Sequence, residues 1–519
     1  MRKVAQFLVV AFFFIGSTII IPPVTNDISF PTTQTTLYIN ESMVNEPVPL
    51  QSSSVKIVYP LSTFPAIVER GDNFTLKVNL SYSPQEWEVM LSTAYDIVQD
   101  EIPLSVSSVE YDAILHVWGV TVMVPPSTSD ELYNLTVRIS TSQGYFEATE
   151  PRAVCVKEIG SNFSFVHLTD FHIGDPRGMK VDVQQTIGWK AAKKCISEIN
   201  LLNPDFVVIT GDLVFGQLYP FEYFFEYRKC YEILQMFQVP TFICPGNHDG
   251  YIQFGQDGFK FWQEFFGPLY YSFDYGNYHF TMVNSYDWPA KSRVAFSYLA
   301  FNWGGYVDKE QLNWIEKDLQ NSRNAKLNLI LLHHNPLWDT KNDSLLKNGY
   351  GGRKELLSLI KKYDVDAVLA GHVHYDDVTI KNGTTYITTT TAASDLGSED
   401  AYWGYRLITI KNGEVESYNY KGEKYSIPSY RLNYTYTLND GSMDTVSVEI
   451  ENDLEMNIEA TIHFYVTIGE YEVENGEIFM ERSKGGIKEV YVKADIDALS
   501  TEEVSIHPAK SQPKHSFHH

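Results

Sequence analysis

Short hydrophobic runs, each ending at a polar residue, recur through the middle of the chain. Five of them lack a strict alternation of apolar and polar residues, which predicts strands buried on both faces. These runs are residues 163–168, 206–209, 241–244, 327–332 and 367–370. Helical patterns lie between several of them, for example over residues 186–202 and 310–319. Strands and helices in alternation predict an α/β layered fold.

A short polar segment follows each of the five runs. In chain order the segments are Asp170-Phe171-His172, Gly211-Asp212, Gly246-Asn247-His248-Asp249, His333-His334-Asn335-Pro336 and Gly371-His372-Val373-His374. Ligands in α/β folds bind beyond the carboxyl ends of the strands, so we expect the segments to converge on one edge. Carboxylate, imidazole and amide groups suit divalent first-row metals. Any one of these residues alone is more often a cap of a strand or helix, but the ordered series predicts a site for two metal ions.

This series resembles that of the calcineurin-like metallophosphoesterases. That family carries Asp-x-His, Gly-Asp, Gly-Asn-His-Asp/Glu, His and Gly-His-x-His in the same order. The resemblance covers residues 161–413 and includes secondary features at 271–276 and 311–315. It implies a four-layer sandwich, in which helices flank two mixed β-sheets. It also implies a metal-dependent phosphoric ester hydrolase, either a phosphomonoesterase or a phosphodiesterase.

The resemblance further implies a set of ligands for each metal ion. The first set is Asp170, His172, Asp212 and His374, and the second is Asp212, Asn247, His333 and His372. Asp212 would bridge the two ions, which we expect to be divalent Mn, Fe, Zn, Co or Ni. The family pattern points to His333 rather than its neighbour His334, which is left as a second candidate.

The family mechanism is in-line attack on phosphorus by a hydroxide that bridges the two metals. His248 would then protonate the leaving group or stabilise the phosphoryl oxygens, and Asp249 would orient His248. Purple acid phosphatases have an iron-binding tyrosine three residues after the bridging Asp, where this chain has Phe215. It therefore resembles a non-purple member. The substrate stays open, and the loops expected to select it are residues 173–185, 251–261, 288–306 and 338–352.

The composition of the chain bears on its expected partners more than on its expected fold. The chain has 519 residues, enough for about three domains of roughly 150 residues each. Its 40 basic and 65 acidic residues give a formal charge of −25, whereas a nucleic-acid-binding protein presents a basic face. We therefore expect a small phosphorylated substrate rather than nucleic acid. The sequence indicates no oligomeric state.

The N-terminus predicts export. Arg2 and Lys3 precede an apolar stretch over residues 4–21, which has the shape of a secretory signal. Its length is also near the ~17–25 residues that span a bilayer, so residues 1–23 are a signal peptide or an N-terminal anchor. We expect the rest of the chain to be extracellular, either secreted or anchored at the cell surface. Eight sequons favour a glycoprotein: Asn40, Asn73, Asn79, Asn134, Asn162, Asn342, Asn382 and Asn433.

Four cysteines in an oxidising compartment predict disulfide bonding. They are Cys155, Cys195, Cys230 and Cys244, and three pairings are open. We expect Cys195 and Cys230 to pair first, because both fall in predicted helices that are near each other in sequence. Cys244 lies inside a core strand and is predicted to be a buried thiol.

Short alternating runs outside the catalytic region are typical of all-β domains. We predict a linker at 24–50, an immunoglobulin- or fibronectin-like sandwich at 51–157, the catalytic domain at 158–421, a β-rich domain at 422–508 and a disordered tail at 509–519. Two flanking β domains also suit a cell-surface structural or adhesion glycoprotein with an inactive phosphoesterase core. Every ligand position is filled by a competent residue, which favours the enzyme.

Overall fold

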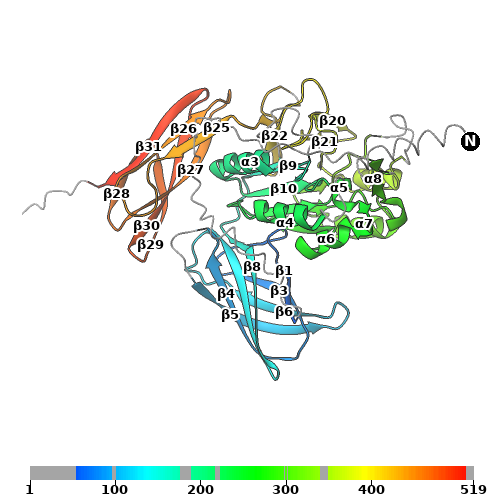
Figure 1. Ribbon diagram of the computed structural model, residues 1–519, viewed down its shortest axis with the longest axis horizontal. Helices are drawn as coiled ribbons and strands as arrows, with labels where there is room; N and C mark the ends of the chain where they lie inside the picture. Colours follow the sequence, from blue (N-terminus) through cyan, green and yellow to red (C-terminus); the bar gives the residue numbers. More distant parts are fainter. Residues whose placement is uncertain are drawn as a thin grey trace, which may run out of the picture. The chain divides into compact units, whose positions relative to one another are not determined.

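The computed structural model describes most of the chain beyond its N-terminal segment (Figure 1). The described residues are 54–95, 101–175, 189–216, 223–296, 299–300, 302–338, 349–422 and 424–509. The predicted signal or anchor, the linker and the sequons Asn40 and Asn342 lie outside these ranges, as does the predicted tail after residue 509. Among the described helices, none combines the length and apolar character needed to cross a membrane.

Two mixed β-sheets form the middle of the central domain. The first has the order β11-β10-β9-β22-β23, with β24 paired to β22, and the second has the order β14-β15-β18-β19-β21-β20. The strands of the first sheet are β9 (Phe163–Leu168), β10 (Phe206–Thr210), β11 (Thr241–Cys244), β22 (Gly404–Lys411), β23 (Glu414–Ser417) and β24 (Ile427–Pro428). Those of the second are β14 (Tyr271–Tyr275), β15 (Tyr278–Met282), β18 (Leu327–Leu331), β19 (Ala367–Ala370), β20 (Asp377–Lys381) and β21 (Thr384–Thr388). Phe165, Phe206 and Leu329 belong to one apolar core between the two sheets.

Helices cover the outer face of each sheet. Buried side chains of α3 (Trp189–Leu202), α4 (Tyr223–Leu234) and α6 (Gly258–Phe265) pack with those of β9 and β10. Those of α7 (Lys309–Asn321) and α8 (Arg353–Lys362) pack with β18 and β19. The remaining short elements are α5 (Asn247–Gly250), η2 (Ala290–Ser292), β12 (Ile252–Gln253), β13 (Gln256–Asp257), β16 (Ala295–Phe296) and β17 (Leu299–Ala300). The predicted order of helix, sheet, sheet and helix is confirmed.

The strands that carry the polar segments run parallel within each sheet. β9, β10 and β11 are mutually parallel, and so are β18 and β19. Every residue of β10, β11, β18 and β19 is buried, which confirms that runs without alternation mark strands covered on both faces. The carboxyl ends of β9, β10 and β11 therefore lie at one edge of the first sheet, and those of β18 and β19 at one edge of the second.

Eight strands precede the central domain and form one continuous hydrogen-bonded path, β1-β3-β6-β5-β4-β7-β8-β2. β5 pairs with β4 through residues 101–104 and with β6 through residues 105–112, so the sheet turns over at this strand. Both halves enclose a common apolar core. The strands are β1 (Val55–Tyr59), β2 (Ala66–Val68), β3 (Asn73–Leu80), β4 (Pro84–Thr93), β5 (Glu101–Asp112), β6 (Val117–Met123), β7 (Glu131–Thr141) and β8 (Gly144–Val156).

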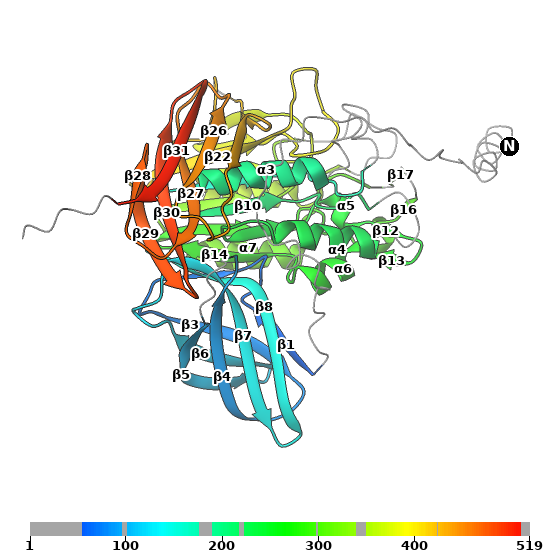
Figure 2. The same ribbon diagram turned by 60° about the vertical axis from the view of Figure 1, so that its left-hand side comes forward.

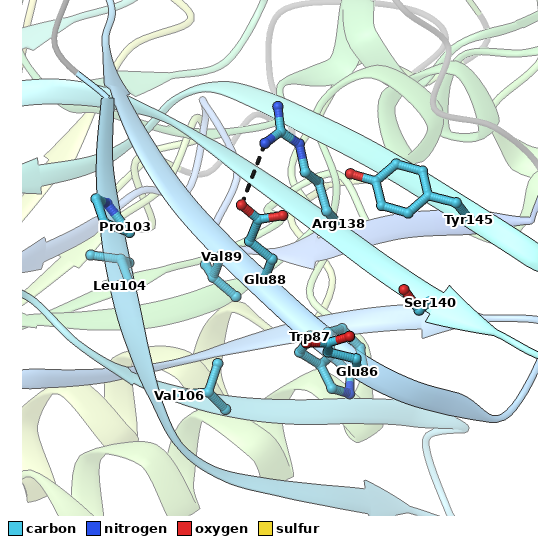
Figure 3. Close-up of a pocket in the computed structure, with 10 residues that line it drawn as sticks. All are labelled: Glu86, Trp87, Glu88, Val89, Pro103, Leu104, Val106, Arg138, Ser140 and Tyr145. Carbon is cyan, nitrogen blue, oxygen red and sulfur yellow. Dashed lines mark ion pairs between the residues drawn. The ribbon is translucent and has the colours of Figure 1, made fainter.

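A hollow of about 370 Å³ is lined by residues of β4, β5, β7 and β8 (Figure 3). Its single basic side chain, Arg138, lies 3.5 Å from Glu88 and 2.7 Å from Glu147, so neighbouring carboxylates neutralise it. No histidine lines the hollow. Within the described ranges, every side-chain cluster able to hold a metal ion belongs to the central domain instead.

Seven strands follow the central domain in two sheets, β25-β26-β31-β28 and β27-β30-β29 (orange to red in Figure 2). Their bounds are β25 (Leu432–Tyr436), β26 (Val446–Asn452), β27 (Ile458–Thr467), β28 (Tyr471–Glu474), β29 (Glu477–Lys484), β30 (Ile487–Ile496) and β31 (Ser500–Pro508). Hydrogen bonds tie this region to α3, from Ser197 Oγ to Tyr434 Oη at 3.2 Å and from Lys194 Nζ to Asn433 Oδ1 at 2.8 Å. The exact domain boundaries stay predictions.

The expected disulfide between Cys195 and Cys230 is wrong. All four cysteines are free and buried, so the buried thiol predicted at Cys244 is confirmed. Cys195 on α3 directs its Sγ at the carbonyl of Ala392, 3.7 Å away. Burial raises the pKa of the Cys230 thiol on α4, and nearby Asp249 raises it further. The two thiols thus face different neighbours although their helices are adjacent in sequence.

His279 on β15 generates a prediction about stability and pH. Burial lowers its pKa, but hydrogen bonds to Asp274 (2.6 Å) and Asp318 (2.9 Å) outweigh burial and raise the pKa to about 9. A raised histidine pKa adds stability that is complete below the unfolded value near 6.5 and is lost as the pH rises through 9. We expect His279→Gln to lower the free energy of unfolding by about 1–2 kcal/mol at pH 6, because Asp274 is partly exposed and screened, and by little at pH 9.5. Urea titrations of both proteins measure this difference, and an equal loss at both pH values would contradict it.

Candidate metal centre

The structure brings the predicted metal ligands together where the two sheets end. Asp170 and His172 follow β9, Asp212 follows β10, Asn247 begins α5 after β11, His333 follows β18, and His372 and His374 follow β19. Donor atoms of their Asp and His side chains form overlapping groups in which the atoms lie within 4.8 Å of one another. The site therefore draws on both sheets, as the convergence of parallel strand ends predicts.

One group gathers around Asp170. Its Oδ1 lies 3.4 Å from Nε2 of His172 and 3.2 Å from Nε2 of His374. The two imidazole nitrogens are themselves 3.2 Å apart. A carboxylate oxygen and two imidazole nitrogens that point at one another fit a shared cation, because all three can donate a lone pair to it.

The second group gathers around Asp212. Its Oδ2 lies 3.0 Å from Nε2 of His333 and 3.5 Å from Nε2 of His172. This oxygen therefore stands between the two groups. The other carboxylate oxygen, Oδ1, accepts the backbone N–H of His248 at 2.8 Å, which fixes the orientation of the carboxylate. The ring of His372 also belongs to this group, with its centroid 5.1 Å from that of the His333 ring.

Two buried atoms in this region test whether a metal fits. Asn247 Oδ1 has no hydrogen-bond partner among the described residues, and His333 Nε2 makes no well-aligned hydrogen bond although Asp212 Oδ2 lies 3.0 Å away. The other polar atom of each side chain is bonded, with Asn247 Nδ2 donating to Tyr251 Oη at 2.6 Å and His333 Nδ1 to the Thr210 carbonyl at 2.6 Å. Buried polar atoms are normally satisfied, so these two oriented lone pairs fit coordination to a cation.

Several of the same residues have a strained backbone. Asp170, His172, Asp212, His372 and His374 all have positive φ, between 46° and 78°. Non-glycine residues rarely adopt this left-handed conformation, which costs of order 1–3 kcal/mol each and clusters at functional sites. Gly371 shows how tight the packing is, since a Cβ there would collide with Thr169 Oγ1 and Asp170 Oδ2. The fold holds the ligands in place at the expense of local strain.

The protonation of the histidines reflects the two carboxylates. Burial lowers the pKa of His333, but Asp212 and Asp170 outweigh it and raise the pKa to about 9. Burial likewise lowers the pKa of His374, and Asp170 then raises it to about 10. His372 differs, because burial and the neighbouring His333 lower its pKa to about 3. The two carboxylates thus favour the protonated forms of His333 and His374, and metal binding would displace those protons.

His248 stands at the edge of this cluster. Its ring lies 4.5 Å from that of His172, and its Nδ1 is 2.6 Å from the carbonyl oxygen of Phe215. The role of Asp249 in orienting His248 stays a prediction. The Asp249 carboxylate accepts three backbone N–H groups, those of Leu213 (2.9 Å), Val214 (3.1 Å) and Gly246 (2.8 Å). Asp249 therefore joins the loops that carry Asp212 and Asn247.

His334 lies near His333 and His372, close enough to count as a further donor. Both of its ring nitrogens already have protein partners, however. Nδ1 is 3.0 Å from Ser285 Oγ, and Nε2 is 3.0 Å from the carbonyl oxygen of Trp303. This geometry favours His333 as the ligand.

Several residues that support the site were not predicted from the sequence. Tyr251 fixes the amide of Asn247, Ser285 receives the backbone N–H groups of His333 and His334, and the Asp395 carbonyl lies 2.6 Å from His374 Nδ1. Only Tyr251, four residues after Asn247, is close to a motif in sequence. Of the expected selectivity loops, residues 176–185, 297–298, 301 and 339–348 lie outside the described ranges.

Comparisons with known proteins agree with this geometry. The family model described as calcineurin-like phosphoesterase matches residues 163–376. The chain is 31% identical over 223 residues to a probable glycerophosphodiester phosphodiesterase GpdQ of Arcobacter nitrofigilis, a match covering 42% of this chain and 74% of that protein. It is 28% identical over 261 residues to a probable cyclic nucleotide phosphodiesterase of Vesicomyosocius okutanii. That match covers 49% of this chain and 97% of the relative. Purple acid phosphatase 23 of Arabidopsis thaliana is 30% identical over 147 residues. That match covers 26% of this chain and 29% of the relative.

The residues that the family model matches include both donor groups. The chain belongs to the calcineurin-like phosphoesterase family and is a metal-dependent phosphoric ester hydrolase.

Proposed function

We propose that the protein is an extracellular dimetal phosphoesterase of the non-purple kind and that its substrates are small phosphodiesters. The observation that carries this proposal is the position of Asp212 Oδ2, 3.0 Å from His333 Nε2 and 3.5 Å from His172 Nε2, between two donor groups. Two relatives named as phosphodiesterases support diester substrates. Phe215 stands where a purple enzyme has its tyrosine, which supports the non-purple assignment.

The ligands divide by position. Asp170, His172 and His374 would hold one ion, and Asn247, His333 and His372 the other, with Asp212 shared. When bound, the two ions supply Lewis-acid charge and lower the pKa of a water molecule. The carboxylates and the strained loops hold the donors in place before the substrate arrives, so little reorganisation is needed during the reaction.

His248 is the residue that handles a proton in this proposal. Its Nδ1 donates to the Phe215 carbonyl, so the proton given to the leaving oxygen would come from Nε2 of the imidazolium form, which becomes neutral imidazole in the step. The ring stands beside His172, within reach of a phosphoryl group held at the donor cluster.

Export rests on the N-terminal sequence and on the sequons. Four sequon asparagines, Asn73, Asn79, Asn162 and Asn382, are exposed and thus accessible to glycosylation. Peptide mass spectrometry of protein from its native source tests this part, and unmodified asparagines at all four positions would contradict it.

The ligand assignment predicts different metal contents for two neighbouring variants. His333→Ala removes the unsatisfied Nε2 donor and is expected to lower bound manganese from about two ions per chain to about one. His334→Ala is expected to keep about two, because its nitrogens already bond to Ser285 and Trp303. Equilibrium dialysis followed by elemental analysis measures both. If His334→Ala loses an ion while His333→Ala keeps two, the assignment is reversed.

The role of His248 predicts a loss of turnover without a loss of metal. His248→Ala is expected to lower kcat for bis(p-nitrophenyl) phosphate by roughly 10²- to 10⁴-fold, the usual effect of removing a general acid. Its metal content should stay near two ions per chain. His116→Ala, on the exposed β5–β6 turn, is the matched control and should keep wild-type kcat. Metal loss in His248→Ala would show that the residue is a ligand.

A further inference from the structure

The structure assigns a substrate-selecting role to Trp303. We propose that its indole forms one wall of the site and stacks on a flat substituent of the phosphodiester, a nucleoside base or an aryl ring. This proposal rests on the proposed function and adds the chemical class of the substituent that stays on phosphorus.

Trp303 stands beside a predicted metal ligand. Its half-buried ring lies 6.0 Å from the ring of His372, with 31° between the ring planes. His248 lies beside His172 instead, at the other group of donors. His248 gives its proton to the leaving oxygen. Trp303, at the opposite group of donors, would therefore contact the substituent that stays on phosphorus.

The loop that presents Trp303 is held by three aromatic side chains. The carbonyls of Asn302, Trp303 and Gly304 each accept one hydrogen bond. The donors are Tyr286 Oη at 2.7 Å, His334 Nε2 at 3.0 Å and Trp288 Nε1 at 2.8 Å, in that order. Three successive carbonyls, each bonded to a different side chain, leave this backbone little freedom.

Neighbouring contacts close the loop on both sides. Tyr306 N–H donates to the Ser285 carbonyl at 2.7 Å, and Trp288 stacks on Tyr306 with 4.4 Å between ring centroids. Gly305 lies against the ring of Tyr350, where an added Cβ would come within 2.5 Å of Cε2. The indole of Trp303 is therefore a pre-positioned surface, and binding to it needs little ordering of the protein.

His334 links this loop to the metal site. It follows the ligand His333 directly, and its Nε2 holds the carbonyl of Trp303. The distance between Trp303 and His372 is thus set by the same segment that positions His333. A flat ring attached to a phosphoryl group at the donor cluster would reach the indole face, whereas a small alkyl group would gain little from it. Stacking of a base on an aromatic side chain changes affinity by about tenfold or more.

Two diesters with the same leaving group test the proposal. Thymidine 5′-(p-nitrophenyl phosphate) and methyl p-nitrophenyl phosphate release the same p-nitrophenolate and differ only in the retained substituent. The wild-type protein loaded with manganese is expected to show a kcat/KM at least about tenfold higher for the thymidine ester. Trp303→Leu is expected to bring that ratio near one through a higher KM. Its kcat/KM for the methyl ester should stay within about threefold of wild type.

Three controls separate stacking from a structural role. Trp303→Phe keeps an aromatic face and should retain most of the preference. Trp314→Leu removes a half-buried tryptophan from α7 and should leave the ratio unchanged. Metal content of Trp303→Leu should equal that of the wild type. An unchanged ratio in Trp303→Leu, or an equal loss on both esters, overturns the proposal.

Binding distinguishes this proposal from the proposed function. Calorimetry with thymidine 5′-phosphate and with methyl phosphate, on manganese-loaded protein, needs no turnover. Wild type is expected to bind the nucleotide about tenfold more tightly than methyl phosphate, and Trp303→Leu is expected to lose that difference. If neither ester is hydrolysed but this binding difference holds, the proposed function fails and the role of Trp303 stands. If both esters are hydrolysed but thymidine 5′-phosphate binds no more tightly than methyl phosphate, only the role of Trp303 fails.

Discussion

The carboxylate of Asp212 is the point on which the rest of the site depends. One oxygen lies between imidazole nitrogens that come from different sheets, and the other is fixed by the backbone of His248. Imidazole nitrogens and carboxylate oxygens gathered this closely fit bound cations, because each can donate a lone pair to a metal ion. Three strand ends from one sheet and two from the other supply these donors.

Several of the predicted ligands have a strained backbone, and contacts with the surrounding fold stabilise that conformation. Five ligands adopt left-handed backbone conformations, and each follows a strand that is buried on both faces or lies against the inter-sheet core. Asp249 adds three hydrogen bonds between the loops after β10 and β11. Rigid strands and bonded loops keep the donors in place, so the geometry does not depend on the substrate.

The sequence predicts the layered fold and the ligand series because both are local. A run without alternation reveals a doubly buried strand, and the residue after it marks the strand end. His333 and Asp212 are recognisable in this way although 120 residues lie between them in the sequence. The resemblance to a family then orders the donors into two groups.

What the sequence does not predict depends on contacts between distant segments. Asp249 is next to His248 in sequence, yet its carboxylate turns towards the backbone of Leu213 and Val214. Cys195 and Cys230 lie on neighbouring helices, yet their thiols face different parts of the core. Trp303 reaches the site because Tyr286, His334 and Trp288 hold its loop. No local pattern encodes such pairings, because the partners meet only after the sheets have packed.

Anomalous diffraction from crystals of the manganese-loaded protein would locate the metal ions. We expect two peaks about 3.5–4 Å apart, with the Asp212 carboxylate between them. His172 and His374 should lie at one peak, and Asn247, His333 and His372 at the other. A single peak, or two peaks that Asp212 does not bridge, would contradict the account.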